Sequence, residues 1–136
     1  MQSNKVLIFR MGGSLFALKV NTLVEVLLRP DSVTPIPGSP EFILGAFNLR
    51  GEIIAAVDIA PILEVSQERE TYFLRVKCEN MDFAFPVDDV IDFYEIEQDL
   101  QPPVKEADFI VGTFDWKGQP VNLLDCEKLA YRLLEA

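Results

Sequence analysis

The chain has 136 residues, 49% of them hydrophobic, no histidine and a net charge of −10 at pH 7. This composition predicts a single domain over residues 1–136, with enough apolar side chains for a core and no run long enough to span a membrane. The charge is uneven: residues 1–67 hold 5 Lys and Arg against 6 Asp and Glu, whereas residues 68–136 hold 7 against 16. So acidic a surface repels phosphate backbones and anionic lipids, which excludes nucleic acid and direct membrane insertion as expected interactions.

The first half of the chain predicts two β-hairpins in order. Runs rich in Val, Leu, Ile and Phe at 6–10 and 15–20 flank Gly12-Gly13, a pair suited to a tight turn. Extended chain over 24–28 and a proline-rich connector follow. A second hairpin then joins 42–47 to 52–57 through the turn Asn48-Leu49-Arg50-Gly51.

Aspartate and asparagine residues follow several of these strands. Asn21 and Asp88 are expected to cap single helical turns, and Asp58 a short turn containing Pro61. Asp125 is expected to cap an amphipathic helix whose apolar face includes Leu129 and Leu133.

The second half repeats the first at an offset of 67 residues. Phe42 to Gly51 aligns without a gap on Phe109 to Gly118, and Asp58 aligns on Asp125. A fixed period indicates a duplicated unit, here about 5–66 and 72–133. With five short strands per copy and little helix, we expect a mainly β fold of two similar five-stranded, SH3-like β-barrel subdomains packed together, with short helical turns and a C-terminal helix.

Catalytic machinery is missing from the sequence. The absence of histidine removes the commonest general base and metal ligand, and no phosphate-binding glycine loop is present. Asp58 and Asp125 are paired by the repeat, as the carboxylates of aspartic proteases are, but they lack the Asp-Thr/Ser-Gly loop of those enzymes. We therefore interpret both as helix caps and expect a protein that is not an enzyme, with no cofactor and no metal.

The cysteines and the N-terminus indicate where the protein works. Cys78 and Cys126 are the only cysteines, and we expect buried, reduced thiols rather than a disulfide or a metal site. The first residues show no basic start followed by an apolar stretch, so no signal peptide is expected. Both features favour a cytoplasmic protein.

Two side chains at predicted hairpin tips leave alternatives open. Arg50 is either an interface residue or a turn arginine exposed to water. Trp116, at the tip of the second copy's hairpin, either folds back over its own barrel or anchors a partner.

The whole chain resembles the CheW-like family, the coupling proteins of bacterial chemosensory arrays. The residues that carry the resemblance are Phe16-Ala17-Leu18-Lys19-Val20, Gly45-Ala46-Phe47-Asn48-Leu49-Arg50-Gly51, Phe85-Pro86-Val87-Asp88-Asp89-Val90 and Leu123-Leu124-Asp125. The resemblance implies two intertwined five-stranded barrels and a non-catalytic scaffold.

The resemblance also implies partners and a binding surface. The partners would be the regulatory domain of a CheA-type histidine kinase, the cytoplasmic tip of a methyl-accepting chemoreceptor and other CheW-like domains. The receptor tip would lie in the groove between the barrels, on Leu23, Glu25, Gly45, Arg50, Gly51 and Ile53 of this chain. The alternative is a stand-alone regulatory module that binds the kinase without engaging receptors.

Overall fold

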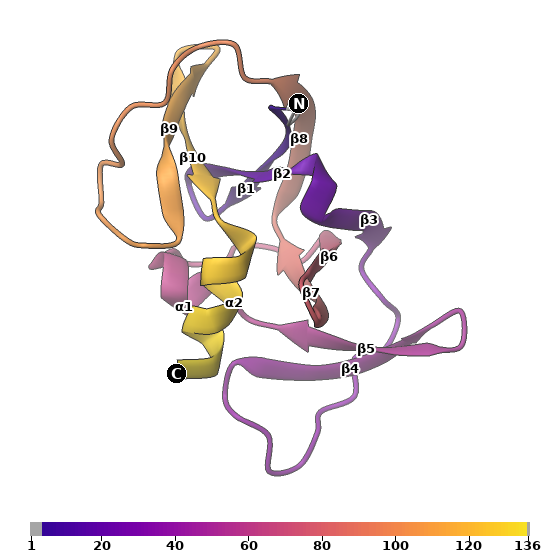
Figure 1. Cartoon of the computed structure of the whole chain (residues 1–136). Coiled ribbons are helices and arrows are strands. Elements are labelled where there is room, and N and C mark those ends of the chain that lie inside the picture. Colours follow the sequence, from indigo (N-terminus) through magenta and orange to yellow (C-terminus); the bar gives the residue numbers. More distant parts are fainter. Residues whose placement is uncertain (1–3, 136) are drawn as a thin grey trace.

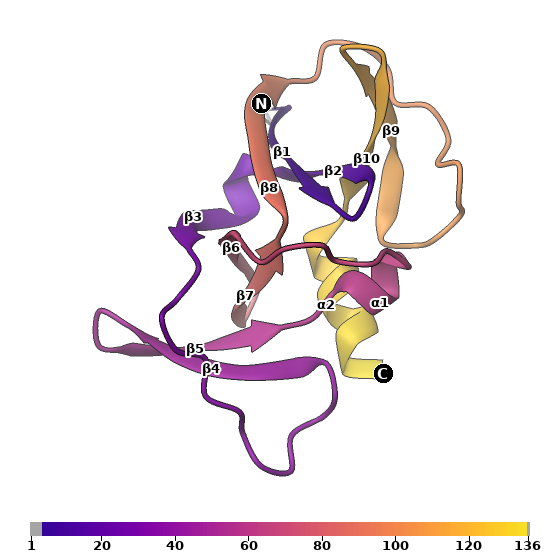
Figure 2. The same cartoon turned by 180° about the vertical axis from the view of Figure 1, so that it is seen from behind.

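The computed structural model describes residues 4–135, and strands make up about half of this part of the chain (Figures 1 and 2). The strands are β1 (Lys5–Met11), β2 (Ser14–Lys19), β3 (Leu23–Leu28), β4 (Ile43–Leu49), β5 (Glu52–Val57), β6 (Tyr72–Cys78), β7 (Met81–Val87), β8 (Asp89–Glu95), β9 (Ile110–Trp116) and β10 (Gln119–Leu124). The helices are α1 (Ala60–Leu63) and α2 (Cys126–Glu135), and a single 3₁₀ turn, η1 (Val20–Thr22), precedes β3. The predicted fold class, mainly β with a C-terminal helix, is confirmed.

The elements repeat with the sequence. β1, β4 and β5 have the same lengths as β6, β9 and β10, and each pair of elements is offset by 67 residues. Isolated bridges repeat as well, with Thr34 pairing to Ala46 in the first copy and Gln101 to Thr113 in the second. The two copies therefore adopt the same local structure.

The two sheets nevertheless mix the copies. The first sheet, here called sheet A, has the strand order β8-β1-β2-β10-β9, and sheet B has the order β3-β6-β7-β5-β4. Each copy thus places its first hairpin, β1–β2 or β6–β7, among the last three strands of the other copy. Parallel pairing joins the copies within each sheet, β2 with β10 and β7 with β5. This is the intertwined arrangement that the resemblance implies.

The exchanged hairpins are buried on both faces. Along β1, Leu7 and Phe9 face a core shared by the two sheets, whereas Val6 and Ile8 face a separate cluster of sheet A. All four side chains are fully buried. Side chains alternate across a strand, so a strand with apolar residues on both sides belongs at the centre of a layered structure.

Three apolar clusters result. The shared core lies between the sheets and includes side chains of both helices. Core A (Val6, Ile8, Leu15, Ala17, Ile96, Phe114, Val121, Leu123) and core B (Phe47, Ile54, Ala56, Phe73, Ala84) lie on the opposite faces of their sheets. Burying one Leu or Phe side chain contributes about 1.5–3 kcal/mol, so these clusters supply most of the driving force for folding.

The two helices lie side by side and close the shared core (Figures 1 and 2). The Ala60 N–H donates to Asp58 Oδ1 at 3.2 Å, and the Lys128 N–H donates to Asp125 Oδ1 at 3.1 Å. Both aspartates therefore accept a backbone N–H at the start of a helix, as predicted, although the N-cap of α1 is Ile59 and Asp58 lies one residue before it. Leu129 and Leu133 are buried together on one face of α2, also as predicted. Among residues 4–135, no helix is both long enough and apolar enough to cross a membrane.

The capping roles predicted for Asn21 and Asp88 are wrong. Asn21 lies inside η1 rather than before it, and β8 begins directly after Asp88. Asp88 is 5% exposed and accepts three backbone N–H groups: Gly12 at 2.7 Å, Arg69 at 2.9 Å and Glu68 at 3.0 Å. The carboxylate therefore binds backbone N–H groups of the β1–β2 turn and of the linker between the copies, and not those of a helix.

Asp88→Ala should lower the free energy of unfolding by about 2–4 kcal/mol, because it removes the acceptor of three backbone donors near or inside the core. The matched control is Asp89→Ala, next in sequence, where the side chain is half exposed and forms a 3.7 Å ion pair with Arg10. The control should change stability by less than about 1 kcal/mol. Urea unfolding of both variants tests this, and equal losses would contradict it.

Candidate functional site

The β4–β5 hairpin places Arg50 at its tip. Arg50 and Gly51 form the turn with φ values of 50° and 89°, and the Gly51 N–H donates to Asn48 Oδ1 at 3.0 Å. Glycine adopts a positive φ without steric cost, so Gly51 lets the two-residue turn close. The predicted turn is confirmed, with β4 extending two residues beyond the predicted strand.

The Arg50 side chain reaches across to the edge strand β3. Its guanidinium donates to Glu25 Oε1 at 2.5 Å, although the side chain remains 66% exposed. Ile53, on β5 and opposite Asn48, is 71% exposed. The structure therefore brings Glu25 and Arg50 into contact and leaves a large apolar side chain in water on the same hairpin.

A buried arginine holds this pair in place. Arg75 lies in β6, is 8% exposed, and forms a two-point contact with Asp82, from Nε at 3.0 Å and from Nη2 at 2.8 Å. The same guanidinium donates to Glu52 at 3.0 Å and to Glu25 at 3.4 Å. Two guanidinium groups and three carboxylates from β3, the β4–β5 hairpin, β6 and β7 thus form one network, here called the Arg75 network. Glu25 connects its buried part to Arg50.

The electrostatics of the network are set by its hydrogen bonds. The bonds to Asp82 and Glu52 raise the pKa of Arg75 despite burial, which acts in the opposite direction. Conversely, the bond donated by Arg75 lowers the pKa of Asp82 below its usual value. Both groups are therefore held in their charged forms, and burial is tolerated because the charges are paired.

The sequence predicted Glu25 and Arg50 as site residues but did not point to Arg75, Asp82 and Glu52, which the structure joins to them in one network. The repeat contains a signal that could have found two of them. At an offset of 67 residues, Arg75 aligns with Ile8 and Asp82 with Leu15, both of which are buried in core A. Where one copy of the repeat has a charged pair and the other copy has an apolar pair, the two subdomains differ in chemistry. This difference is visible in the sequence.

The other predicted residues lie in different surroundings. Leu23 begins β3 and packs, partly buried, against the shared core. Gly45 is buried with φ of 151°, and a Cβ there would lie 2.4 Å from the Thr34 carbonyl oxygen. Gly45 is therefore required for close backbone packing and presents no side chain to a partner.

Trp116 is partly buried and packs against core A. The Lys117 Nζ lies 4.9 Å from the centre of its ring, a distance typical of a cation–π contact. This packing favours the interpretation in which Trp116 covers its own subdomain.

The fold and this hairpin define a duplicated, intertwined β protein with a charged network at one hairpin tip. A family model described as the CheW-like domain matches residues 5–133. The chain belongs to the CheW-like family.

Individual relatives agree with the family model. The chain is 29% identical over 131 residues to the chemotaxis protein CheW of Thermotoga maritima, covering 92% of this chain and 86% of that protein. It is 26% identical over 102 residues to the chemotaxis protein CheW of Helicobacter pylori, covering 73% of this chain and 61% of that one. The crystal structure of the scaffolding protein TtCheW from Thermoanaerobacter tengcongensis has the same fold, with a TM-score of 0.77, 24% identity, and coverage of 91% and 90% of the two chains.

Arg75→Ile should lower the free energy of unfolding by about 3 kcal/mol, because the remaining carboxylates would repel one another without their buried cation. The double variant Arg75→Ile/Asp82→Leu copies the apolar pair of the other subdomain and should lose less than the single variant. Urea unfolding of the three proteins measures the difference. If the double variant is less stable than the single one, unpaired carboxylates are not the cause of the stability loss, and the prediction is contradicted.

The Arg75–Asp82 pair should also make stability depend on pH. Asp82 has a lower pKa in the folded chain than in the unfolded chain, so its contribution is present above about pH 4 and is lost as the pH falls through the folded value. The gap in unfolding free energy between wild type and Asp82→Asn should therefore narrow from about pH 5 to pH 2. The exposed Asp108→Asn serves as control and should show no such trend. A constant gap for Asp82→Asn would contradict the prediction.

Proposed function

We propose that this protein is a non-catalytic, cytoplasmic adaptor that couples chemoreceptors to a CheA-type histidine kinase in bacterial chemosensory signalling. Family membership supports this role, and so do the relatives, which are named as chemotaxis and scaffolding proteins. The sequence adds that no histidine is available for acid–base or nucleophilic chemistry.

The observation that carries the proposal is the exposed guanidinium of Arg50, held at a hairpin tip by a charge network that is anchored on the buried Arg75. An exposed arginine normally samples many rotamers, and ordering it on binding costs free energy. Here Glu25 holds Arg50 and Arg75 holds Glu25, so the donor geometry exists before a partner arrives. Arginine is one of the residue types that most often dominate binding energy at protein interfaces.

The proposed receptor-binding surface consists of Glu25, Arg50, Gly51 and Ile53. Its chemistry suits a helical receptor tip that offers a hydrogen-bond acceptor to Arg50 and an apolar side chain to Ile53. In this assignment Leu23 and Gly45 shape the backbone beneath the surface rather than touching the receptor.

The kinase would bind elsewhere, through its regulatory domain, and other CheW-like domains would add further contacts. Several weak contacts in one assembly strengthen one another, because each bound partner raises the effective concentration of the next. An adaptor of this kind needs no single high-affinity interface.

Arg50→Ala should weaken binding to receptor-tip fragments by about tenfold or more and leave kinase binding unchanged, because only the receptor contact uses Arg50. The chain offers a matched control in Lys117→Ala. Lys117 occupies the equivalent hairpin tip of the other subdomain and has the same φ of 50°. Co-sedimentation with receptor-tip fragments, with and without the kinase regulatory domain, measures both affinities.

The outcomes separate the candidate roles. If wild type bridges the two partners and only Arg50→Ala loses the receptor, both the coupling role and the assigned surface stand. Wild type binding the kinase alone would instead support a regulatory module without receptor contact. Equal losses for Arg50→Ala and Lys117→Ala would remove Arg50 from the binding surface.

A further inference from the structure

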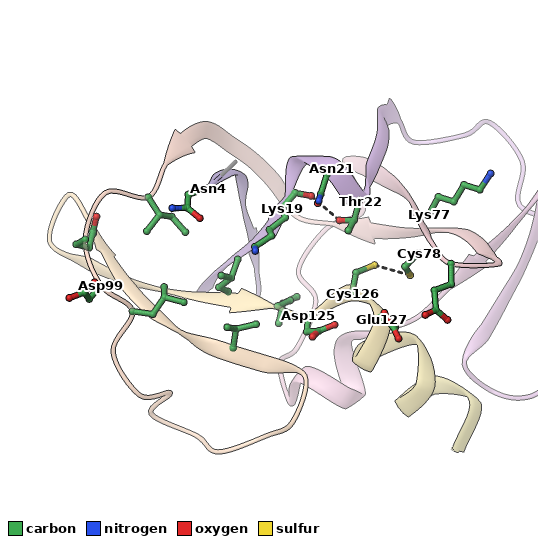
Figure 3. A pocket seen from close by; sticks show the side chains of 17 residues that line it. Asn4, Lys19, Asn21, Thr22, Lys77, Cys78, Asp99, Asp125, Cys126 and Glu127 are labelled. Carbon is green, nitrogen blue, oxygen red and sulfur yellow. Dashed lines mark hydrogen bonds between the residues drawn. The ribbon is translucent and has the colours of Figure 1, made fainter. Parts of the chain in front are cut away.

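The two cysteines meet at the junction of the two sheets, although the repeat does not relate them. Cys78 ends β6 of sheet B, and Cys126 begins α2, which follows β10 of sheet A after the single residue Asp125. Their sulfur atoms are 3.3 Å apart, and both residues are reduced and buried (Figure 3). A disulfide bond is about 2.05 Å long, so the sulfurs need to approach by only about 1 Å to bond.

A surface pocket gives small molecules access to this pair. The pocket has a volume of about 730 Å³ and is lined by both cysteines together with Lys77 and Glu79. Lys77 and Glu79, the neighbours of Cys78 in sequence, are exposed, so this side of the pocket is open to solvent. A hydroperoxide is small enough to enter it, whereas a folded protein is not.

We propose that Cys78 and Cys126 form a thiol-oxidation site whose substrate is a hydroperoxide and whose product is an intramolecular disulfide. The Cys78 thiolate attacks the peroxide oxygen and becomes a sulfenic acid, and the leaving hydroxide takes up a proton to become water. The Cys126 sulfur then attacks the sulfenic sulfur, and a second water leaves. Two thiols and one hydrogen peroxide thus yield one disulfide and two waters, a two-electron oxidation.

The assignment of Cys78 as the first sulfur to react has two supports. Cys78 is the more exposed of the two, at 7% against 4%. In addition, the hydrogen bond with Cys126 lowers the pKa of Cys78, because it stabilises the thiolate, although burial and the carboxylates of Glu127, Asp125 and Glu79 act in the opposite direction. The same hydrogen bond raises the pKa of Cys126. Cys126 is then placed to resolve the sulfenic acid before further oxidation.

The disulfide would tie sheet B to the helix that continues sheet A. The two cysteines are separated by 48 positions in sequence, and a cross-link over a loop of that length restricts the unfolded chain substantially. We therefore expect the oxidised protein to resist heat better than the reduced protein and to hold its two sheets more rigidly together.

The experiment uses the full chain with hydrogen peroxide in near-stoichiometric amount. In the folded protein, thiols titrated after denaturation should fall from two per chain to none, and peptide mapping should find Cys78 linked to Cys126. Dithiothreitol should restore both thiols. The apparent Tm of the oxidised protein should rise by about 5 °C or more. Cys126→Ser is the matched control and should collect sulfenic or sulfinic acid on Cys78 with no rise in Tm.

Three outcomes would overturn the proposal. Both thiols could remain titratable after peroxide treatment of the folded chain. The disulfide could form only in denaturant, which would show that the native pair is not positioned to react. Disulfide-linked dimers could form in place of the internal bond. All three are measured on the wild-type chain and do not depend on whether a cysteine variant folds or on the proposed coupling function.

Discussion

The exchange of hairpins between the two copies is the constraint on which the rest of this structure depends. β1–β2 and β6–β7 each bury both faces, one against the shared core and the other against the separate core of its sheet. Neither sheet can form from one copy, because each lacks its central strands until the other copy supplies them. The two subdomains must therefore fold together, and the position of one relative to the other is set by continuous strand pairing rather than by a flexible linker.

The two subdomains share the same backbone conformation but differ in the chemistry of their side chains. At equivalent positions, core A contains Ile8 and Leu15, whereas sheet B contains Arg75 and Asp82. A buried ion pair contributes little to stability compared with a well-packed apolar pair of similar size, so stability alone does not account for the substitution. The charged pair instead holds Glu25, and through it the exposed Arg50. The hairpin tips differ in the same way: Trp116 packs on its own subdomain, whereas Arg50 is mostly exposed and bonds to Glu25.

The junction between the sheets contains the least symmetric features of the molecule. Asp88 joins the β1–β2 turn to the linker between the copies, through one hydrogen bond from Gly12 and two from the linker. In addition, α2 is much longer than its counterpart α1. The start of α2 brings Cys126 to Cys78, a contact that has no equivalent elsewhere because neither cysteine is repeated. Features that belong to the whole molecule rather than to one copy thus concentrate where the copies meet.

The sequence by itself determined the local structure and the family. Some features depend on neighbouring residues in the chain and could therefore be predicted. They are the strands with alternating apolar residues, the turn at Arg50-Gly51 and the aspartates Asp58 and Asp125 at the starts of the helices. The 67-residue repeat could also be read from the sequence. Only the tertiary structure decided which strands pair across the copies, that Asp88 binds the linker instead of capping a helix, and that Arg75 reaches Glu25, Glu52 and Asp82. The same is true of the contact between Cys78 and Cys126. Apart from the bond between Arg75 and Asp82 within the β6–β7 hairpin, these contacts join residues about 20 or more positions apart in sequence. Their free energy depends on burial and distance, which no local pattern specifies.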